Sequence, residues 1–426
     1  MAIRRFTRRR FAASLLGLPL VAATARPARV RISDAGARGD GVTVNTAPIQ
    51  AAIDRLAAGG GGTLVVPRGV FVSGALFLKP GVHLQLDAGA VLRCSTDMMH
   101  FPPRRTRIEG HFEERFTPAL INASGCDGLR ITGAGTLDGA GRPIWDRFWQ
   151  LRNAAPDPHN FPNLGVPRAR LALIEESRDV LVEGVTFKDS QFWNLHLYRC
   201  DGVVVRGARF EVPDDYKQAP SSDGIDLDSC RDVLIDGCHF SVTDDCIAAK
   251  GSKGPRALED RSSPPVERIR VRNCMFRRGH QAFSCGSEAT VVRDVRIEDC
   301  RVTGAMNLLM LKLRPDTPQL YEDIHVRNIT LNNEGGRVLL IKPWSQYANL
   351  QGAAPPKSTV RAVTLGGLCG RFGAFGEISP NPGQTDIADI RFEAIDLTLA
   401  DPDLSVSGTQ DVRFIDVTIN GRKRSA

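Results

Sequence analysis

The chain repeats one short pattern along most of its length. An alternation of apolar and polar residues, followed by a turn-prone residue, begins at positions 128, 179, 202, 232, 268, 294, 323, 389 and 411. Successive side chains of a strand point to opposite faces, so this period predicts a strand with one face turned inward. The glycine or polar residue that follows predicts a bend. We therefore expect a series of short strands, each ending in a turn.

The spacing of the repeats favours stacked β-coils over an antiparallel sandwich. The intervals between successive starts are irregular, and the shortest ones, from 179 to 202 and from 389 to 411, are nearly equal. A constant minimum interval with longer intervals between is typical of a solenoid with loops inserted on one side. Strands of a sandwich would follow one another about every 8–12 residues. The predicted fold class is therefore all-β, a parallel β-helix.

One column of residues follows the strands at the same distance in each repeat. It consists of Val185, Ala208, Cys238, Cys274, Cys300, Ile329, Ile395 and Val417. Because cysteine alternates there with aliphatic residues, we expect these thiols to be buried rungs of a stacked ladder. No Cys-x-x-Cys pair occurs among the ten cysteines, so a zinc site is not indicated. Neither a metal nor a cofactor is expected.

The N-terminal part and the longer intervals are organised differently. Residues 45–57 have apolar residues at helical spacing and are followed by the glycines of residues 59–62, which predicts a short helix. Such a helix would cap the open end of the solenoid. Segments without the repeat are expected to be loops over the coils: 95–118, 141–167, 213–221, 251–266 and 343–360.

The N-terminal segment 1–25 has the pattern of an export signal. Arg8 and Arg9 precede the apolar stretch Phe11–Ala23, which ends in small residues. This is typical of a twin-arginine signal peptide. The stretch is shorter than the ~20 residues that a membrane-spanning helix needs. We expect a signal over 1–25, a single catalytic domain over 26–426, and a periplasmic or secreted protein.

The basic charge of the chain comes mostly from this signal. Removal of segment 1–25 takes away Arg4, Arg5, Arg8, Arg9 and Arg10 and no acidic residue, so the formal net charge falls from +7 to +2. A surface for nucleic acid is therefore not indicated. Membrane attachment is not expected after removal of the signal, and the mature protein is expected to be a monomer.

Two N-terminal segments resemble the first coils of the pectin-lyase-like superfamily. They run from Asp34 to Asp54 and from Gly60 to Gly69. The resemblance implies a right-handed parallel β-helix. Hydrolases, lyases and phage tail-spikes share this fold, so the reaction has to be inferred from the middle of the chain.

Four ordered motifs in that middle part resemble the polygalacturonase family, glycoside hydrolase family 28. Its signatures are Asn-Thr-Asp-Gly, Asp-Asp-Cys, Gly-His-Gly and Arg-Ile-Lys. The matching segments are Ser222-Asp223-Gly224-Ile225-Asp226, Thr243-Asp244-Asp245-Cys246, Gly279-His280-Gln281 and Met310-Leu311-Lys312. The chain departs from the family at Ser221, Ser222, Gln281 and Met310, and the family's arginine is lost at 310.

The resemblance implies that Asp223, Asp244, Asp245 and His280 are catalytic. Repulsion within a compact acid cluster raises the pKa of at least one member, which supplies a proton donor beside ionised bases. Asp223 and Asp244 are separated by one minimal coil, so we expect them one above the other on adjacent coils. The family implies inversion, with Asp244 as acid and the other two aspartates holding the attacking water. His280 is expected to orient or tune an acid, although a purely structural imidazole stays possible.

A galacturonate-containing pectic polysaccharide or oligosaccharide is the expected substrate. The family's lysine carries over onto Lys312, and Arg314 shares its strand face, so Arg314 either replaces the lost arginine or caps a turn before Pro315. Trp145 and Trp149 are expected to line a cleft. Further candidate binding residues are Trp193, His196, Gln281, Trp344 and Tyr347.

The sequence leaves three alternative functions open. A rhamnogalacturonan or another mixed polysaccharide is one, because Met310 lacks the positive charge of the family's arginine. A polysaccharide lyase, which would need calcium, and a noncatalytic carbohydrate-binding β-helix are the others. The large insertions favour exo over endo action.

Overall fold

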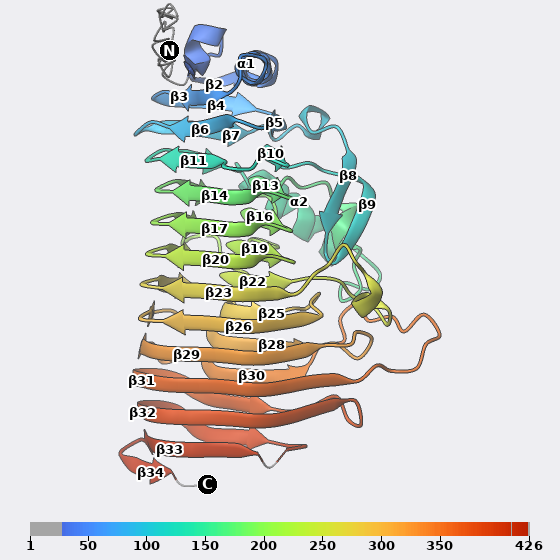
Figure 1. The fold of residues 1–426 in the computed structure, drawn as a ribbon, viewed down its shortest axis with the longest axis vertical. Coiled ribbons are helices and arrows are strands. Elements are labelled where there is room, and N and C mark those ends of the chain that lie inside the picture. The colour runs from blue at the N-terminus through green and yellow to red at the C-terminus, as the bar shows by residue number, and fades with distance from the viewer. Residues whose placement is uncertain (1–27, 410, 425–426) are drawn as a thin grey trace, which may run out of the picture.

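The computed structural model describes residues 28–409 and 411–424. In this part the chain is a right-handed parallel β-helix, with the helix α1 (Thr46–Ala58) at the N-terminal end of the stack (Figure 1). The expected fold class and the expected N-terminal helix are confirmed. The proposed signal at 1–25 lies outside the described residues.

Strands of successive coils pair in parallel and form three columns. The first column consists of β1 (Ala28–Arg31), β3 (Gly62–Val66), β6 (Val82–Leu86), β11 (Arg130–Gly133), β14 (Arg178–Glu183), β17 (Asp201–Arg206), β20 (Arg231–Asp236), β23 (Val266–Arg272), β26 (Val291–Glu298), β29 (Leu320–Asn332), β31 (Ser358–Ile378), β32 (Thr385–Val406) and β33 (Val412–Ile419). The second consists of β2 (Asp40–Val44), β4 (Gly69–Ser73), β7 (Ala90–Cys94), β12 (Thr136–Asp138), β15 (Thr186–Lys188), β18 (Arg209–Glu211), β21 (His239–Ser241), β24 (Met275–Arg278) and β27 (Arg301–Val302).

The third column carries the site, and we call it the site sheet. It consists of β5 (Leu76–Leu78), β10 (Ile121–Ser124), β13 (Ala172–Glu175), β16 (Leu195–Tyr198), β19 (Ile225–Asp228), β22 (Ile247–Lys250), β25 (Gln281–Cys285), β28 (Asn307–Leu313) and β30 (Arg337–Pro343). Near the C-terminus, β29 reaches the second column, and β31 and β32 extend across to the site sheet. The strand β34 (Arg422–Arg424) turns back antiparallel on β33 and ends the stack.

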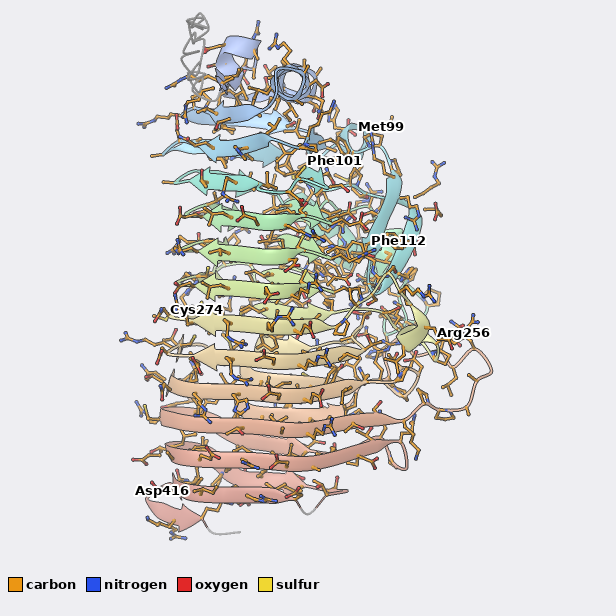
Figure 2. The ribbon with its side chains drawn as sticks, viewed as in Figure 1. Met99, Phe101, Phe112, Arg256, Cys274 and Asp416 are labelled. Atoms are coloured by element: carbon orange, nitrogen blue, oxygen red, sulfur yellow. The ribbon has the colours of Figure 1, made fainter. Side chains whose placement is uncertain are left out.

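The interior of the coils is filled by like side chains stacked from rung to rung. Phe187, Phe210, Phe240 and Phe276 lie in one stack with ring centroids 4.9–5.2 Å apart. The expected column from Val185 to Val417 is buried throughout, which confirms the interpretation of its cysteines as core residues. Cys274 is marked within the coil stack in Figure 2. All ten cysteines are free thiols.

Two of the expected loops contain regular secondary structure. Residues 141–167 include the helix α2 (Arg142–Asn153), and residues 95–118 include the antiparallel hairpin of β8 (Arg104–Ile108) and β9 (His111–Phe116). The hairpin stands beside the stack, with Phe112 on it in Figure 2. Among the described residues, the structure contains no helix that is long and apolar enough to cross a membrane.

Candidate active site

One pocket opens on the outer face of the site sheet, bordered by the inserted segments. Its volume is about 280 Å³. Its lining includes all four residues expected to be catalytic, Asp223, Asp244, Asp245 and His280. Five of the expected binding residues line it too: Trp193, Gln281, Lys312, Trp344 and Tyr347. The structure therefore brings together motifs that lie far apart in the sequence.

The three aspartates come from two neighbouring turns. Asp223 lies just before β19, and Asp244 and Asp245 lie just before β22. Ile225 pairs with Ile247, and the N–H of Gly224 donates to the carbonyl oxygen of Asp245 at 2.9 Å. Asp223 is therefore level with Asp245. The expectation that it stacks on Asp244 was wrong by a single position, because the register of this coil is one position longer than expected.

Gly224 allows the two turns to approach each other. A Cβ atom at this position would lie 2.5 Å from the carbonyl oxygen of Cys246 and 2.8 Å from Cδ1 of Phe240, which is fixed in the core stack. Hydroxyls tie the turns together beside it, since the oxygens of Ser222 and Thr243 lie 2.9 Å apart. The backbone N–H of Thr243 also donates to Ser222 Oγ at 3.0 Å. Small residues at these positions therefore fix the spacing of the acids.

Two cations contact two of the three carboxylates. Lys312 Nζ donates to Asp245 Oδ2 at 2.7 Å, and Ser284 Oγ donates to the same oxygen at 2.6 Å. His280 Nδ1 lies 3.2 Å from Asp244 Oδ1. The ammonium of Lys312 also lies 4.8 Å from the centre of the Trp344 ring. Asp245 is thus held by two side chains, whereas Asp244 is held, among the described residues, by the half-exposed imidazole of His280 and by the backbone N–H of Asp245, which donates to Asp244 Oδ1 at 3.0 Å.

The three acids do not share one protonation state. Burial and the negative charge of Asp244 raise the pKa of Asp223 well above its ordinary value. Burial opposes ionisation of Asp244 as well, but the positive charges of His280 and Lys312 outweigh it and lower the pKa of Asp244 to about 2. The same ion pair raises the pKa of His280 to about 9. At neutral pH the site therefore contains a protonated acid beside an ionised one.

The acid cluster also has the ligand spacing of a metal site. Ligand atoms of Asp244, Asp245 and His280 lie within 4.8 Å of one another. The ammonium of Lys312, however, already contacts Asp245. A divalent cation there would have to displace a buried charge or be repelled by it.

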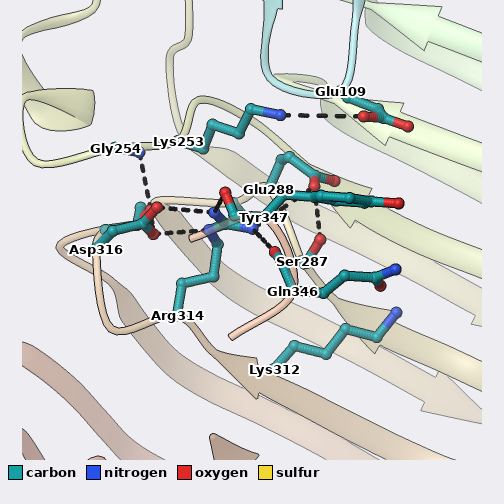
Figure 3. Close-up of polar contacts among 12 residues, drawn as sticks. Glu109, Lys253, Gly254, Ser287, Glu288, Lys312, Arg314, Asp316, Gln346 and Tyr347 are labelled. Carbon is teal, nitrogen blue, oxygen red and sulfur yellow. Dashed lines mark hydrogen bonds and ion pairs between the residues drawn. The ribbon is translucent and has the colours of Figure 1, made fainter. Parts of the chain in front are cut away.

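Arg314 does not point into the pocket. Its guanidinium is buried, donates twice to Asp316 at 2.8 Å, and donates to the carbonyl oxygens of Gln346 and Tyr347. Figure 3 shows Arg314 turned toward Asp316. The alternative that Arg314 has left the strand and stabilises a turn is the correct one, because β28 ends at Leu313.

Two further expectations were wrong. His196 is fully buried behind the pocket wall, with its Nδ1 2.7 Å from Arg170 Nη1 and its Nε2 3.6 Å from Asp228. Burial lowers the pKa of His196 to about 4. Trp145 is buried too and donates to the carbonyl oxygen of Ser190, so only Trp149 of the two insertion tryptophans lines the pocket.

Several pocket residues were not anticipated from the sequence. Glu109 comes from the tip of the β8–β9 hairpin, Arg152 from α2, Lys250 from the end of β22 and Glu288 from the segment after β25. Strand alternation contains a signal for Lys250, since Ile247 and Ala249 face the core and Lys250 therefore faces the groove. For Glu109 and Arg152 the repeat contains no signal, because they belong to insertions.

Comparison with known proteins identifies a family and several relatives. The family model described as glycosyl hydrolases family 28 matches residues 63–410. The chain is 27% identical over 327 residues to a probable polygalacturonase from Vitis vinifera, covering 74% of this chain and 63% of that protein. It is 23% identical to an exopolygalacturonase from Zea mays, covering 89% of this chain and 84% of the relative.

Solved structures agree on the fold. The crystal structure of a hyperthermoactive exopolygalacturonase from Thermotoga maritima superposes with a TM-score of 0.70 at 23% identity, covering 93% of this chain and 94% of that one. A polygalacturonase from Erwinia carotovora gives 0.66 at 19% identity, covering 92% and 98%. Because the family model spans most of the sequence and the aspartate motifs converge in one pocket, the chain belongs to glycosyl hydrolases family 28.

Proposed function

We propose that the protein hydrolyses galacturonosidic linkages of pectic polysaccharide or its oligosaccharides, with inversion and from the chain end. One observation carries the proposal. Three aspartates from two adjacent coils line one pocket beside His280 and Lys312, and two of them, Asp223 and Asp244, differ in protonation state. A neutral acid next to an ionised carboxylate is the arrangement that glycosidic hydrolysis needs.

The geometry supports a division of roles among the acids. The side chain of Asp244 is 31% exposed and faces the open pocket, so it is placed to protonate the glycosidic oxygen. Asp223 and Asp245 are almost buried. Among the described residues, Asp245 Oδ1 has no hydrogen-bond donor and is therefore available to accept from a water molecule.

Asp244 has to gain a proton before it acts as the acid. A substrate carboxylate bound in the pocket adds negative charge near Asp244 and competes for the positive charges that lower its pKa, so the pKa of Asp244 rises. The proton held on Asp223 is close by, since both residues belong to one coupled cluster. In this proposal, substrate binding thus brings Asp244 into the protonated form that can donate to the glycosidic oxygen.

Three inserted segments support action at the chain end. Asn163 donates to Glu109 Oε1 at 3.1 Å, which links the α2 segment to the β8–β9 hairpin. The hydroxyl of Tyr347 donates to the carbonyl oxygen of Phe161 at 2.8 Å, which links the loop after β30 to the same segment. The hairpin tip, α2 and this loop all line the pocket, so they form a wall that a continuous polymer would have to pass.

The proposal is tested by the products formed from polygalacturonate and from defined oligogalacturonides. We expect free galacturonate as the first product from the earliest time points, and proton NMR should show it with inverted anomeric configuration. Early release of mixed oligomers would contradict exo action. Retained configuration would contradict the mechanism.

Hydrolysis of a rhamnogalacturonan is the second candidate, and Met310 favours it. Met310 is buried, and its sulfur accepts a hydrogen bond from Gln281 Nε2 at 3.1 Å. Because methionine is uncharged, this position offers no positive charge to an acidic sugar. Parallel assays on rhamnogalacturonan distinguish the two substrates.

The proposal also covers export and assembly. It includes twin-arginine export, one catalytic domain over 26–426, a monomeric state, and no attachment to membrane or nucleic acid in the mature protein.

A further inference from the structure

Lys250 is a buried amine that faces the pocket. It is the last residue of β22, and its side chain is 8% exposed. Its ammonium lies 4.9 Å from the centre of the Trp193 ring and lines the same cavity as the catalytic acids. An ammonium has three N–H donors, and a buried donor without an acceptor costs free energy.

Two carboxylates approach the ammonium without forming a hydrogen bond to it. Glu288 Oε2 lies 3.6 Å and Asp226 Oδ1 3.9 Å from Nζ, both beyond hydrogen-bond distance. Asp226 is fully buried, and within the described part of the chain both of its carboxylate oxygens have no donor. Lys250 is therefore held beside these two groups without a hydrogen bond, and its N–H groups stay available to a ligand.

Some of the acids around Lys250 are protonated and carry no negative charge. Burial raises the pKa of Asp226 well above its ordinary value, and burial with the charge of Asp244 does the same for Asp223. Glu288 is shared with Arg314, 3.9 Å away, and with the hydroxyl of Ser287. Asp223 and Asp226 therefore offset little of the charge of Lys250, and Glu288 is the ionised carboxylate beside it.

The other candidates for binding an acidic sugar are already engaged. Met310 has no charge, and Arg314 is bonded to Asp316. Lys312 and His280 contact the catalytic aspartates. Arg152 lines the pocket, but its Nε donates to the carbonyl oxygen of Pro158. This leaves Lys250 as the buried pocket cation that, among the described residues, forms no hydrogen bond.

We propose that Lys250 binds the carboxylate of the galacturonate at the walled end of the pocket, and so sets the preference for an acidic over a neutral sugar there. Asp226 and Glu288 are the acids that lie beside the amine and position it. The inference rests on the proposed function and adds a specificity-determining residue to it. The lost arginine at position 310 is then compensated from a different strand of the site sheet.

Binding of monosaccharides to a variant blocked in turnover tests this role. In an Asp244→Asn background, calorimetry or ligand NMR compares galacturonate with galactose, before and after Lys250→Gln. We expect galacturonate to bind roughly 10–100-fold more weakly in the Lys250→Gln protein, as for loss of a charge-assisted hydrogen bond. Galactose binding should change less than about twofold, and Lys250→Arg should restore part of the selectivity.

Two controls keep the test decisive. Lys342→Gln removes a lysine of the same sheet that pairs with Glu377 at 3.3 Å outside the pocket, and it should leave the selectivity intact. Lys250→Gln combined with Asp226→Asn removes the buried acid with its neighbour, in case the single variant is unstable. Equal weakening of both sugars, or unchanged selectivity in both Lys250 variants, would overturn the inference. Binding is read without hydrolysis, so a failure of the proposed activity on pectic substrates is recognised separately.

Discussion

Asp223 and Asp244 differ in protonation although they belong to one cluster, and this makes their amide variants informative. Asp223→Asn replaces a neutral acid by a neutral amide, so we expect the midpoint of thermal unfolding to stay unchanged or to rise. Asp244→Asn removes the partner of His280. Both variants, and Asp245→Asn, should lower kcat by at least about 10³-fold, because the acids act as one unit. Initial rates and thermal scans measure the two effects, and more than about a tenth of wild-type kcat in Asp244→Asn would contradict the assignment.

The ion pair of His280 with Asp244 predicts a definite pH dependence. The pKa of His280 is raised from its ordinary 6.5 to about 9, so the pair stabilises the fold fully below pH 6.5 as long as Asp244 is ionised. This contribution is lost as the pH rises through about 9. NMR titration of the imidazole should give the raised pKa, and Asp244→Asn should return it toward 6.5. An unchanged pKa of His280 in that variant would mean that a group other than Asp244 raises it.

Single residues show where sequence reasoning succeeds. Asp223, Asp244, Asp245, His280 and Lys312 were expected from the resemblance of ordered motifs to a known family, and the structure places all five in one pocket. Arg314 and His196 have the right chemistry and lie next to or within strands of the site sheet, but the direction of such a side chain depends on its tertiary partners. For these two residues the partners are Asp316 and Arg170, and no local pattern reveals them.

The elements of the solenoid were predictable, whereas the inserted elements were largely not. Each coil repeats a local pattern that is independent of the rest of the chain. The helix α2 has a proline in its first turn and buries Ile144, Trp145 and Phe148 at helical spacing, so a signal existed in a segment expected to be a loop. The β8–β9 hairpin is held by contacts with distant coils, which the sequence of the hairpin alone does not contain.

The hairpin is anchored by one buried ion pair, and we expect its loss to open the pocket. Arg107 of β8 lies 3.1 Å from Asp228 of β19 and 3.4 Å from Asp260, and Arg170 donates to the carbonyl oxygen of Arg107 at 2.9 Å. Arg107→Met leaves Asp228 buried with a lost partner, which costs about 3–5 kcal/mol. Urea unfolding measures this loss. Chromatography should show longer products appearing beside galacturonate, since Glu109 follows closely on the same hairpin.

Arg105 provides the matched control for the hairpin. Its ion pair with Glu114, at 3.0 Å, is exposed, and Arg105→Met should cost about 0–1 kcal/mol and leave the products unchanged. If Arg107→Met and Arg105→Met behave alike, the buried pair does not hold the wall in place.

At the scale of the whole molecule, the coil stack and the proposed export route together predict that the cysteines stay reduced in the exported protein. All ten cysteines are free, and only Cys369 is exposed. A chain that crossed a membrane unfolded would reach an oxidising compartment with every thiol accessible, and disulfides would form there. A folded chain passing through the twin-arginine route keeps the other nine inside the coils. We therefore expect the exported enzyme to react with about one equivalent of a thiol reagent when native and with ten when denatured. The variant with Arg8→Lys and Arg9→Lys should remain in the cytoplasm. Mass spectrometry that found disulfides in the exported protein, or undiminished export of that variant, would show that the chain folds after it has crossed.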